Sequence, residues 1–175
     1  MLRAAHSAPS TFIAELKRSA KISEMKIEGY LFSQVCVLSP KKDEAGIYQL
    51  LPHSRYANKR KLKLHKYGVG PFCGFSIPTE IRTSGVYAIV SGGVVKYVGR
   101  CQNLSARFNS GYGNISPRNC FSGGQQTNCR INNLMFSEAS VQPSIHLYFH
   151  ASLDFVNIEV EIIERLKPSW NLARN

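Results

Sequence analysis

The last predicted helix of the chain carries a carboxylate where an apolar side chain is expected. Residues 154–167 have helical periodicity, with Asp154 as the helix cap and Pro168 as the stop. At about 100° per residue, Glu159 lies in the middle of the apolar stripe, and Glu161 falls on the solvent side. A carboxylate among apolar neighbours is costly unless it is paired or binds a metal ion. An arginine partner and a metal site are therefore both open interpretations of Glu159.

Two tyrosines lie in the strands of a predicted β-hairpin. Residues 85–90 and 94–99 are rich in β-branched and aromatic side chains, and a glycine-containing turn separates them. A three-residue turn would place Tyr87 opposite Tyr97 on one face of the sheet, whereas a two-residue turn would place it opposite Val98. We expect the first arrangement, in which both hydroxyl groups share a face.

Five short motifs follow one another through the second half of the chain. In order, they are Gly85-Val86-Tyr87, Tyr97-Val98-Gly99, Arg100 with Asn103-Leu104, Arg107 on a short helix that Asn103 can cap, and Glu159 twelve residues before Asn171 in the pattern E-x8-P-x-W-N. In this order and spacing they resemble the GIY-YIG nuclease superfamily, over roughly residues 82–172.

The resemblance implies a fold, an activity and a set of site residues. The fold is α/β (α+β), with a small antiparallel three-stranded sheet flanked by helices in a nuclease domain of residues 82–175. Residues 1–81 form an N-terminal extension, a DNA-contacting region. The activity is that of a Mg²⁺-dependent (or Mn²⁺-dependent) endonuclease, in which water attacks a DNA phosphate. The catalytic residues implied are Tyr87, Tyr97, Arg107, Asn171 and the metal ligand Glu159.

The resemblance also implies a role for three of these side chains. Tyr87 orients or deprotonates the water, Tyr97 positions the phosphate, and Arg107 neutralises charge that develops on it. An ordinary tyrosine has a pKa near ~10, so Tyr87 needs help to act as a base. Some family members place a His or Tyr four residues after the helix arginine, but that position is Gly111 here. Tyr112 is one residue later and could serve if the segment contains an insertion.

The charge of the chain indicates a polyanionic partner. Twenty-two Lys and Arg residues against eleven Asp and Glu give a formal net charge of +11. Residues 53–66 hold six of these cations and no acid, and residues 101–137 are acid-free and rich in amides. The predicted DNA-binding residues are Lys59, Arg60, Lys61, Lys63, Arg100, Tyr112, Arg118, Asn128 and Arg130.

Other features of the sequence exclude several classes of protein. The five cysteines form no C-x-x-C pair, which argues for reduced thiols rather than a zinc site. No apolar run approaches the ~18 residues of a membrane span, and residues 1–10 lack the apolar region of a secretion signal. We therefore expect a cytoplasmic protein. Residues 9–22 predict a short helix.

Three functions compete. The first is sequence-specific cleavage of duplex DNA, as by a restriction enzyme; with one active site per chain, a homodimer would cut both strands. The second is a structure-specific or single-strand nuclease in DNA repair. The third is a catalytically dead nucleic-acid-binding module, against which the joint presence of all five implied catalytic residues argues. The acid-free, amide-rich segment favours the first, because amides and arginines read base edges.

Overall fold

The predicted hairpin is the frame of the sheet. In the computed structural model, which describes residues 23–172, β5 (Gly85–Ser91) and β6 (Val94–Cys101) pair antiparallel. They are joined by Gly92 and Gly93, whose φ angles of 57° and 75° suit the two-residue turn that matches the twist of a hairpin. The helix predicted over residues 9–22 lies outside the described residues.

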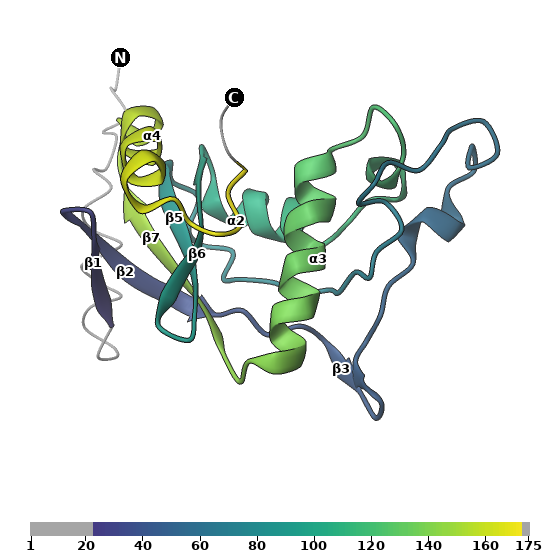
Figure 1. Cartoon of the computed structure of the whole chain (residues 1–175), viewed down its shortest axis with the longest axis horizontal. Helices are drawn as coiled ribbons and strands as arrows, with labels where there is room; N and C mark the ends of the chain where they lie inside the picture. Colours follow the sequence, from purple (N-terminus) through teal and green to yellow (C-terminus); the bar gives the residue numbers. More distant parts are fainter. Residues whose placement is uncertain (1–22, 173–175) are drawn as a thin grey trace, which may run out of the picture.

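The sheet has five strands, so the prediction of three strands was wrong. Its order is β1-β2-β7-β5-β6, and all neighbours are antiparallel (Figure 1). β7 (Ile145–Ala151) pairs with β5 on one side and with β2 (Tyr30–Val37) on the other, and β1 (Glu24–Ile27) pairs with β2. Two strands thus come from the first 81 residues. They cover the edge of β7, whose backbone groups would otherwise lack partners.

Helices cover both faces of the sheet. On one face, Val86, Ala88 and Val90 of β5 pack against Ile158 and Ile162 of α4 (Phe155–Leu166). On the opposite face, the alternate residues of β5 pack against α2 (Leu104–Arg107) and α3 (Gln126–Val141). All seven residues of β5 are buried, as expected for a strand covered on both sides.

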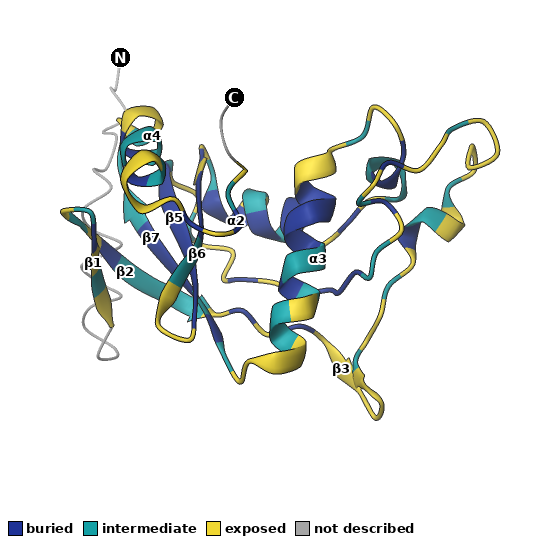
Figure 2. Cartoon of the chain, viewed as in Figure 1, coloured by how far each residue is buried: buried dark blue, intermediate teal, exposed yellow. Residues whose placement is uncertain are grey.

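The rest of the described chain forms a region of loops, residues 50–72 and 113–125, that we call the loop lobe. It includes two short 3₁₀ helices, Pro52–Arg55 and Pro117–Cys120, and has its own core around Phe72, Ile115 and Phe121. A two-stranded sheet, β3 (Lys42–Asp43) with β4 (Gly46–Ile47), precedes it. Figure 2 shows much of the lobe's surface exposed, at the end of the molecule away from α4. Between residues 23 and 172, no helix has the length and apolar character that crossing a membrane requires.

Candidate active site

Tyr87 and Tyr97 share one face of the sheet, as predicted, but by another route. The turn has two residues rather than three, and a β-bulge follows it, so that Lys96 is an extra residue and Ile89 pairs with Tyr97. Because Tyr87 and Ile89 are two residues apart, they point to the same face. Tyr97 joins them there, and Tyr87 itself lies opposite Gly99.

Gly99 makes room for the Tyr87 ring. A Cβ atom at Gly99 would lie 2.4 Å from the Tyr87 hydroxyl oxygen and 2.6 Å from its Cζ atom, much closer than atoms pack. The ring of Tyr87 therefore crosses directly over the neighbouring strand. The glycine that closes the Tyr97-Val98-Gly99 motif is needed for this packing.

Tyr112 enters the site through a π-helical turn. The side-chain oxygen of Asn103 accepts the N–H of Ala106 at 2.9 Å and caps α2, as predicted. The chain then widens into a π-helical turn, Phe108–Tyr112, which the bond from Gly113 N–H to the Phe108 carbonyl closes at 2.7 Å. One extra residue per turn brings Tyr112 toward the place that residue 111 would occupy in a regular α-helix. The π-helical turn thus accommodates the one-residue insertion before Tyr112 that the sequence analysis considered.

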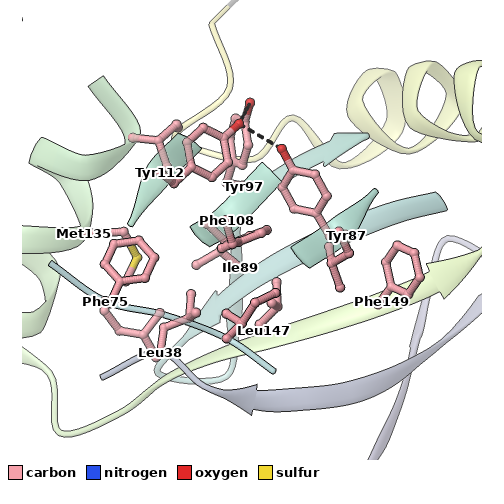
Figure 3. Packing of buried hydrophobic residues seen from close by; sticks show 14 of the residues in the cluster. Leu38, Phe75, Tyr87, Ile89, Tyr97, Phe108, Tyr112, Met135, Leu147 and Phe149 are labelled. Carbon is pink, nitrogen blue, oxygen red and sulfur yellow. Dashed lines mark hydrogen bonds between the residues drawn. The ribbon is translucent and has the colours of Figure 1, made fainter. Parts of the chain in front are cut away.

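Three hydroxyl groups and one guanidinium form a buried network, of which Figure 3 shows the three tyrosines. The hydroxyl oxygen of Tyr112 lies 2.8 Å from that of Tyr87 and 3.4 Å from that of Tyr97. Arg107 donates from Nη2 to Tyr112 at 2.9 Å and from Nε to Tyr87 at 3.4 Å. Its guanidinium also lies over the Tyr112 ring, 4.6 Å from the centroid. Two tyrosines therefore hold the orientation of Arg107.

Burial keeps these hydroxyl groups neutral. Removal from water raises the pKa of Tyr87 above the usual tyrosine range, the nearby Tyr97 raises it further, and Arg107 lowers it only in part. Burial likewise raises the pKa of Tyr97 and of Tyr112. At neutral pH all three side chains are therefore hydrogen-bond donors and acceptors, not phenolate bases.

An open pocket of about 570 Å³ lies beside this network. Its lining includes Tyr87, Tyr97, Arg100, Arg107, Asn128 and Glu159, from five separate helices and strands. A second hollow of about 300 Å³ adjoins it at Arg107, Gln125 and Asn128 and continues along residues 124–128. The structure thus brings four of the five implied catalytic residues to one cavity.

Glu159 lies at the edge of the buried face of α4, not at its centre as predicted. The buried face is centred on Ile158 and Ile162, while Val156 is 44% exposed. The helix is rolled toward Glu161, whose carboxylate accepts a hydrogen bond from the Tyr30 hydroxyl at 2.7 Å. Tyr30 belongs to β2, which the prediction left out of the sheet.

Both interpretations of Glu159 have support in its surroundings. Its Oε2 lies 3.6 Å from Nε of Arg100, and the side chain is 13% exposed at the pocket. Within residues 23–172, no three His, Cys, Asp or Glu side chains gather as a metal-binding group. Mg²⁺ is commonly held by one or two carboxylates, with water and substrate phosphate completing its shell. A single carboxylate beside an open pocket fits such an ion, and does not fit a tetrahedral zinc site.

Asn171 holds the free edge of β6 and is not among the residues that line the pocket. Its side-chain oxygen accepts the N–H of Val98 at 2.9 Å, and its side-chain nitrogen donates to the Val98 carbonyl at 2.8 Å. The N–H of Trp170 donates to the Lys96 carbonyl at 2.8 Å. The C-terminal segment therefore continues the hydrogen bonding of the sheet next to Tyr97, and Asn171 acts here as a positioning residue.

Asn171→Ala is expected to destabilise the protein by about 1–3 kcal/mol, because it leaves the N–H and carbonyl of Val98 without partners. Urea denaturation measures this loss. Asn157→Ala is the matched control, since Asn157 is exposed and bonds only to Asp154 among the contacts described, so its change should stay within about 0.5 kcal/mol. An unchanged unfolding midpoint combined with lost activity would assign Asn171 to the chemistry instead.

The predicted DNA-binding residues separate into accessible and structural ones. Arg100 is exposed at the pocket. Asn128 also lines the pocket, but it is buried and donates to the side chain of Gln125, and Tyr112 is fully buried behind the pocket, so neither was correctly predicted as an accessible DNA contact. The four cations that were predicted to bind DNA from the loop lobe are all exposed: Lys59, Arg60, Lys61 and Lys63.

The other two predicted arginines bind main-chain carbonyl groups. Arg130 is buried and donates to the carbonyl of Trp170 at 2.5 Å, so it is not available to a ligand. Arg118 is half-buried, and its Nη1 donates to the carbonyls of Phe121 and Ser122 at 3.4 and 3.0 Å. Both guanidinium groups therefore stabilise the chain, and neither was recognised as structural from the sequence.

Two amides in the segment that was expected to face a ligand instead form hydrogen bonds with main-chain groups beneath the site. Asn132 is buried, accepts the N–H of Cys73 at 2.9 Å, and donates to the carbonyls of Cys73 and Tyr112 at 2.8 and 2.6 Å. Asn109 binds the N–H and carbonyl of Ile77 in the same two-point manner. These contacts tie residues 73–77 of the first half beneath the tyrosines.

The sequence analysis assigned no role to five residues of the pocket wall: Cys101, Gln102, Ala106, Ser110 and Gln125. Cys101 directly follows the predicted strand, and Gln102 and Ser110 flank the helix that carries Arg107, so proximity to the motifs was the available signal. Burial raises the pKa of the Cys101 thiol to about 12. The thiol is therefore neutral at pH 7 and unsuited to act as a nucleophile.

Comparison of the chain with models of known protein families, with curated proteins and with solved structures finds no match in any of the three.

Proposed function

We propose that this chain is a Mg²⁺-dependent endonuclease of the GIY-YIG type that hydrolyses phosphodiester bonds in DNA. One observation carries the proposal: Tyr87, Tyr97, Arg107 and Glu159, from separate elements, meet at a single open pocket. Each was assigned to this site from the motifs alone. Side chains far apart in sequence converge in this way where a shared ligand must be held.

The chemistry of the pocket suits a phosphate group. Arg100 and Arg107 line it, and Glu159 is the one acidic residue in the lining. Guanidinium groups bind phosphate oxygens through paired, charge-assisted hydrogen bonds. Arg107 is already oriented by Tyr87 and Tyr112, so it stabilises charge on the phosphate without reorganising. Tyr87 and Tyr97 supply neutral hydroxyl groups that orient a water molecule and a phosphate oxygen.

Glu159 is the residue that would hold Mg²⁺ in this proposal. Mg²⁺ held there would supply Lewis-acid polarisation of the phosphate and stabilisation of the leaving oxygen. Arg100, which lies 3.6 Å from the carboxylate, holds Glu159 toward the pocket and can turn to a phosphate when the substrate enters. Its side chain is 42% exposed, which leaves room for that movement.

Sequence-specific cleavage of duplex DNA, by a homodimer that cuts both strands, is the finer form of the proposal. The net charge of +11 supports a long polyanion contact. The exposed amides of Gln102 and Gln125 line the pocket and can hydrogen-bond to base edges. A two-fold dimer on a palindromic site is the simplest arrangement of two such pockets.

Incubation of the protein with supercoiled plasmid and Mg²⁺, followed by sequencing of the product ends, tests the proposal. We expect discrete linear fragments that share one sequence motif, and no cleavage in EDTA. Random nicks, or cleavage restricted to forks, flaps or single strands, would support the repair nuclease in place of the restriction-type enzyme. Intact plasmid, with all DNA forms uncut in both Mg²⁺ and Mn²⁺, would contradict the nuclease itself.

A further inference from the structure

The loop lobe carries positive charge with no acid to balance it. Residues 45–79 and 101–137 contain no Asp or Glu, and together they supply every residue of the lobe. Six Lys and Arg residues lie within residues 53–66. Concentrated like charge destabilises a folded chain through self-repulsion, and a bound polyanion offsets that repulsion.

Backbone contacts join the end of the basic segment to the other half of the loop lobe. Leu64 forms a β-bridge with Phe121, and the N–H of His65 donates to the Cys120 carbonyl at 3.1 Å. The carbonyl of Lys63 accepts two hydrogen bonds from Ser122, from its N–H at 2.8 Å and from its hydroxyl at 3.1 Å. These contacts fix the backbone of residues 63–65 to residues 120–122. The C-terminal end of the basic segment is therefore held in place on the lobe, which lowers the cost of ordering it when a ligand binds.

Three of the four exposed cations at residues 59–63 have no partner in the described part of the chain. Arg60, Lys61 and Lys63 make no side-chain hydrogen bond or ion pair there, whereas Lys59 donates to the Ser54 carbonyl at 2.7 Å. Arg100, by contrast, pairs with an acid. The charges of Arg60, Lys61 and Lys63 are thus free for a ligand, while Lys59 helps to hold the loop.

A continuous path of residues joins this surface to the pocket. The second hollow runs from Arg107 along residues 124–128, and its lining begins two residues after Ser122, which binds Lys63. In Figure 1 the loop lobe lies beyond the α3 end that carries these residues. A nucleic acid whose phosphate sits at Arg107 can therefore extend over the start of α3 toward the lobe.

The lobe lacks the aromatic platforms that single strands need. Its four aromatic residues are Tyr56, Tyr67, Phe72 and Phe121, and none is exposed. Tyr56 packs on Phe121 with ring centroids 4.9 Å apart, and Tyr67 lies beneath Lys66. Single-strand binding relies on exposed rings against which bases stack, while duplex binding relies on neutralising phosphates. The surface therefore suits a duplex backbone.

We propose that the loop lobe is a docking surface for the phosphate backbone of duplex DNA beside the cut site, with Arg60, Lys61 and Lys63 as its contacts. This inference rests on the proposed function for the identity of the nucleic acid, and it adds that the substrate is double-stranded beyond the pocket. The lobe binds the flank of the substrate, and the pocket performs the cleavage.

The test measures binding without cleavage. The full chain and a variant with Arg60→Gln, Lys61→Gln and Lys63→Gln are titrated against labelled duplex and single-stranded DNA in EDTA, over a series of salt concentrations. If all three cations contact phosphates, the slope of log K against log salt for the duplex becomes shallower by roughly 2.7. We expect binding of single-stranded DNA to change little. Thermal unfolding confirms that the variant folds like the wild type.

A matched variant changes three exposed lysines outside the lobe, Lys26→Gln, Lys42→Gln and Lys167→Gln. It lowers the net charge equally and should leave the slope unchanged. An unchanged slope in the lobe variant, an equal effect of the matched variant, or an equal loss for single strands would each overturn the inference. Because no cleavage is involved, these outcomes are independent of whether the wild type cuts DNA in Mg²⁺.

Discussion

Replacement of Glu159 by glutamine is expected to slow DNA cleavage by ~10²–10³, the usual effect of losing a key electrostatic group at a phosphoryl centre. Glutamine keeps the size of the side chain but removes its charge, so it holds Mg²⁺ poorly and no longer forms an ion pair with Arg100. Binding of duplex DNA should persist, because the cations of the pocket and the loop lobe are unchanged. Single-turnover cleavage and binding in EDTA measure the two effects separately.

Glu161→Gln is the matched control on the same helix. Glu161 pairs with Arg165 at 2.9 Å and accepts the Tyr30 hydroxyl, and it does not line the pocket. Its replacement should affect stability slightly and leave the cleavage rate close to that of the wild type. If Glu159→Gln still cut within about tenfold of the wild-type rate, Glu159 would be only a partner of Arg100 and not the metal ligand.

The local elements of the site could be predicted from the sequence. The hairpin strands, the Asn103 cap and the last helix follow from side-chain alternation, capping chemistry and the stop at Pro168, all of which act over a few residues. The bulge at Lys96 could not be predicted from the sequence, because it depends on how β6 twists beside β5. The bulge nevertheless leaves Tyr87 and Tyr97 on the same face of the sheet.

Contacts between distant segments account for the errors. No local pattern in residues 30–37 predicts that β2 pairs with β7, more than a hundred residues later. That pairing places Tyr30 against α4 and rolls Glu159 to the edge of the helix. The same limit applies to Arg130 and Asn132, which look like ligands for DNA in the sequence and prove to be partners of main-chain carbonyls.

The second large effect is expected from Tyr87→Phe, with Tyr112→Phe as its partner in a double-mutant cycle. The Tyr112 oxygen accepts from Arg107, so the single Tyr112 proton is free to point to the Tyr87 oxygen, 2.8 Å away. In the arrangement that we expect, Tyr87 accepts from Tyr112 and Arg107, and its own proton is directed to the pocket. Loss of this donor should slow cleavage by ~10²–10³.

Tyr112→Phe should have a smaller effect, because it removes the hydrogen bond that orients the Tyr87 hydroxyl but leaves that hydroxyl in place as a donor. A single hydrogen bond contributes about 1 kcal/mol, which corresponds to a roughly five- to tenfold slower rate. If Tyr112 acts only through Tyr87, adding Tyr112→Phe to Tyr87→Phe should slow cleavage almost no further, so the cycle is strongly non-additive.

Burial raises the pKa of both tyrosines, so neither should titrate between about pH 6 and 9, and all variants should share one pH profile. Fully additive losses would show that Tyr112 acts through Arg107 instead, and a rate for Tyr87→Phe close to that of the wild type would remove Tyr87 from the chemistry.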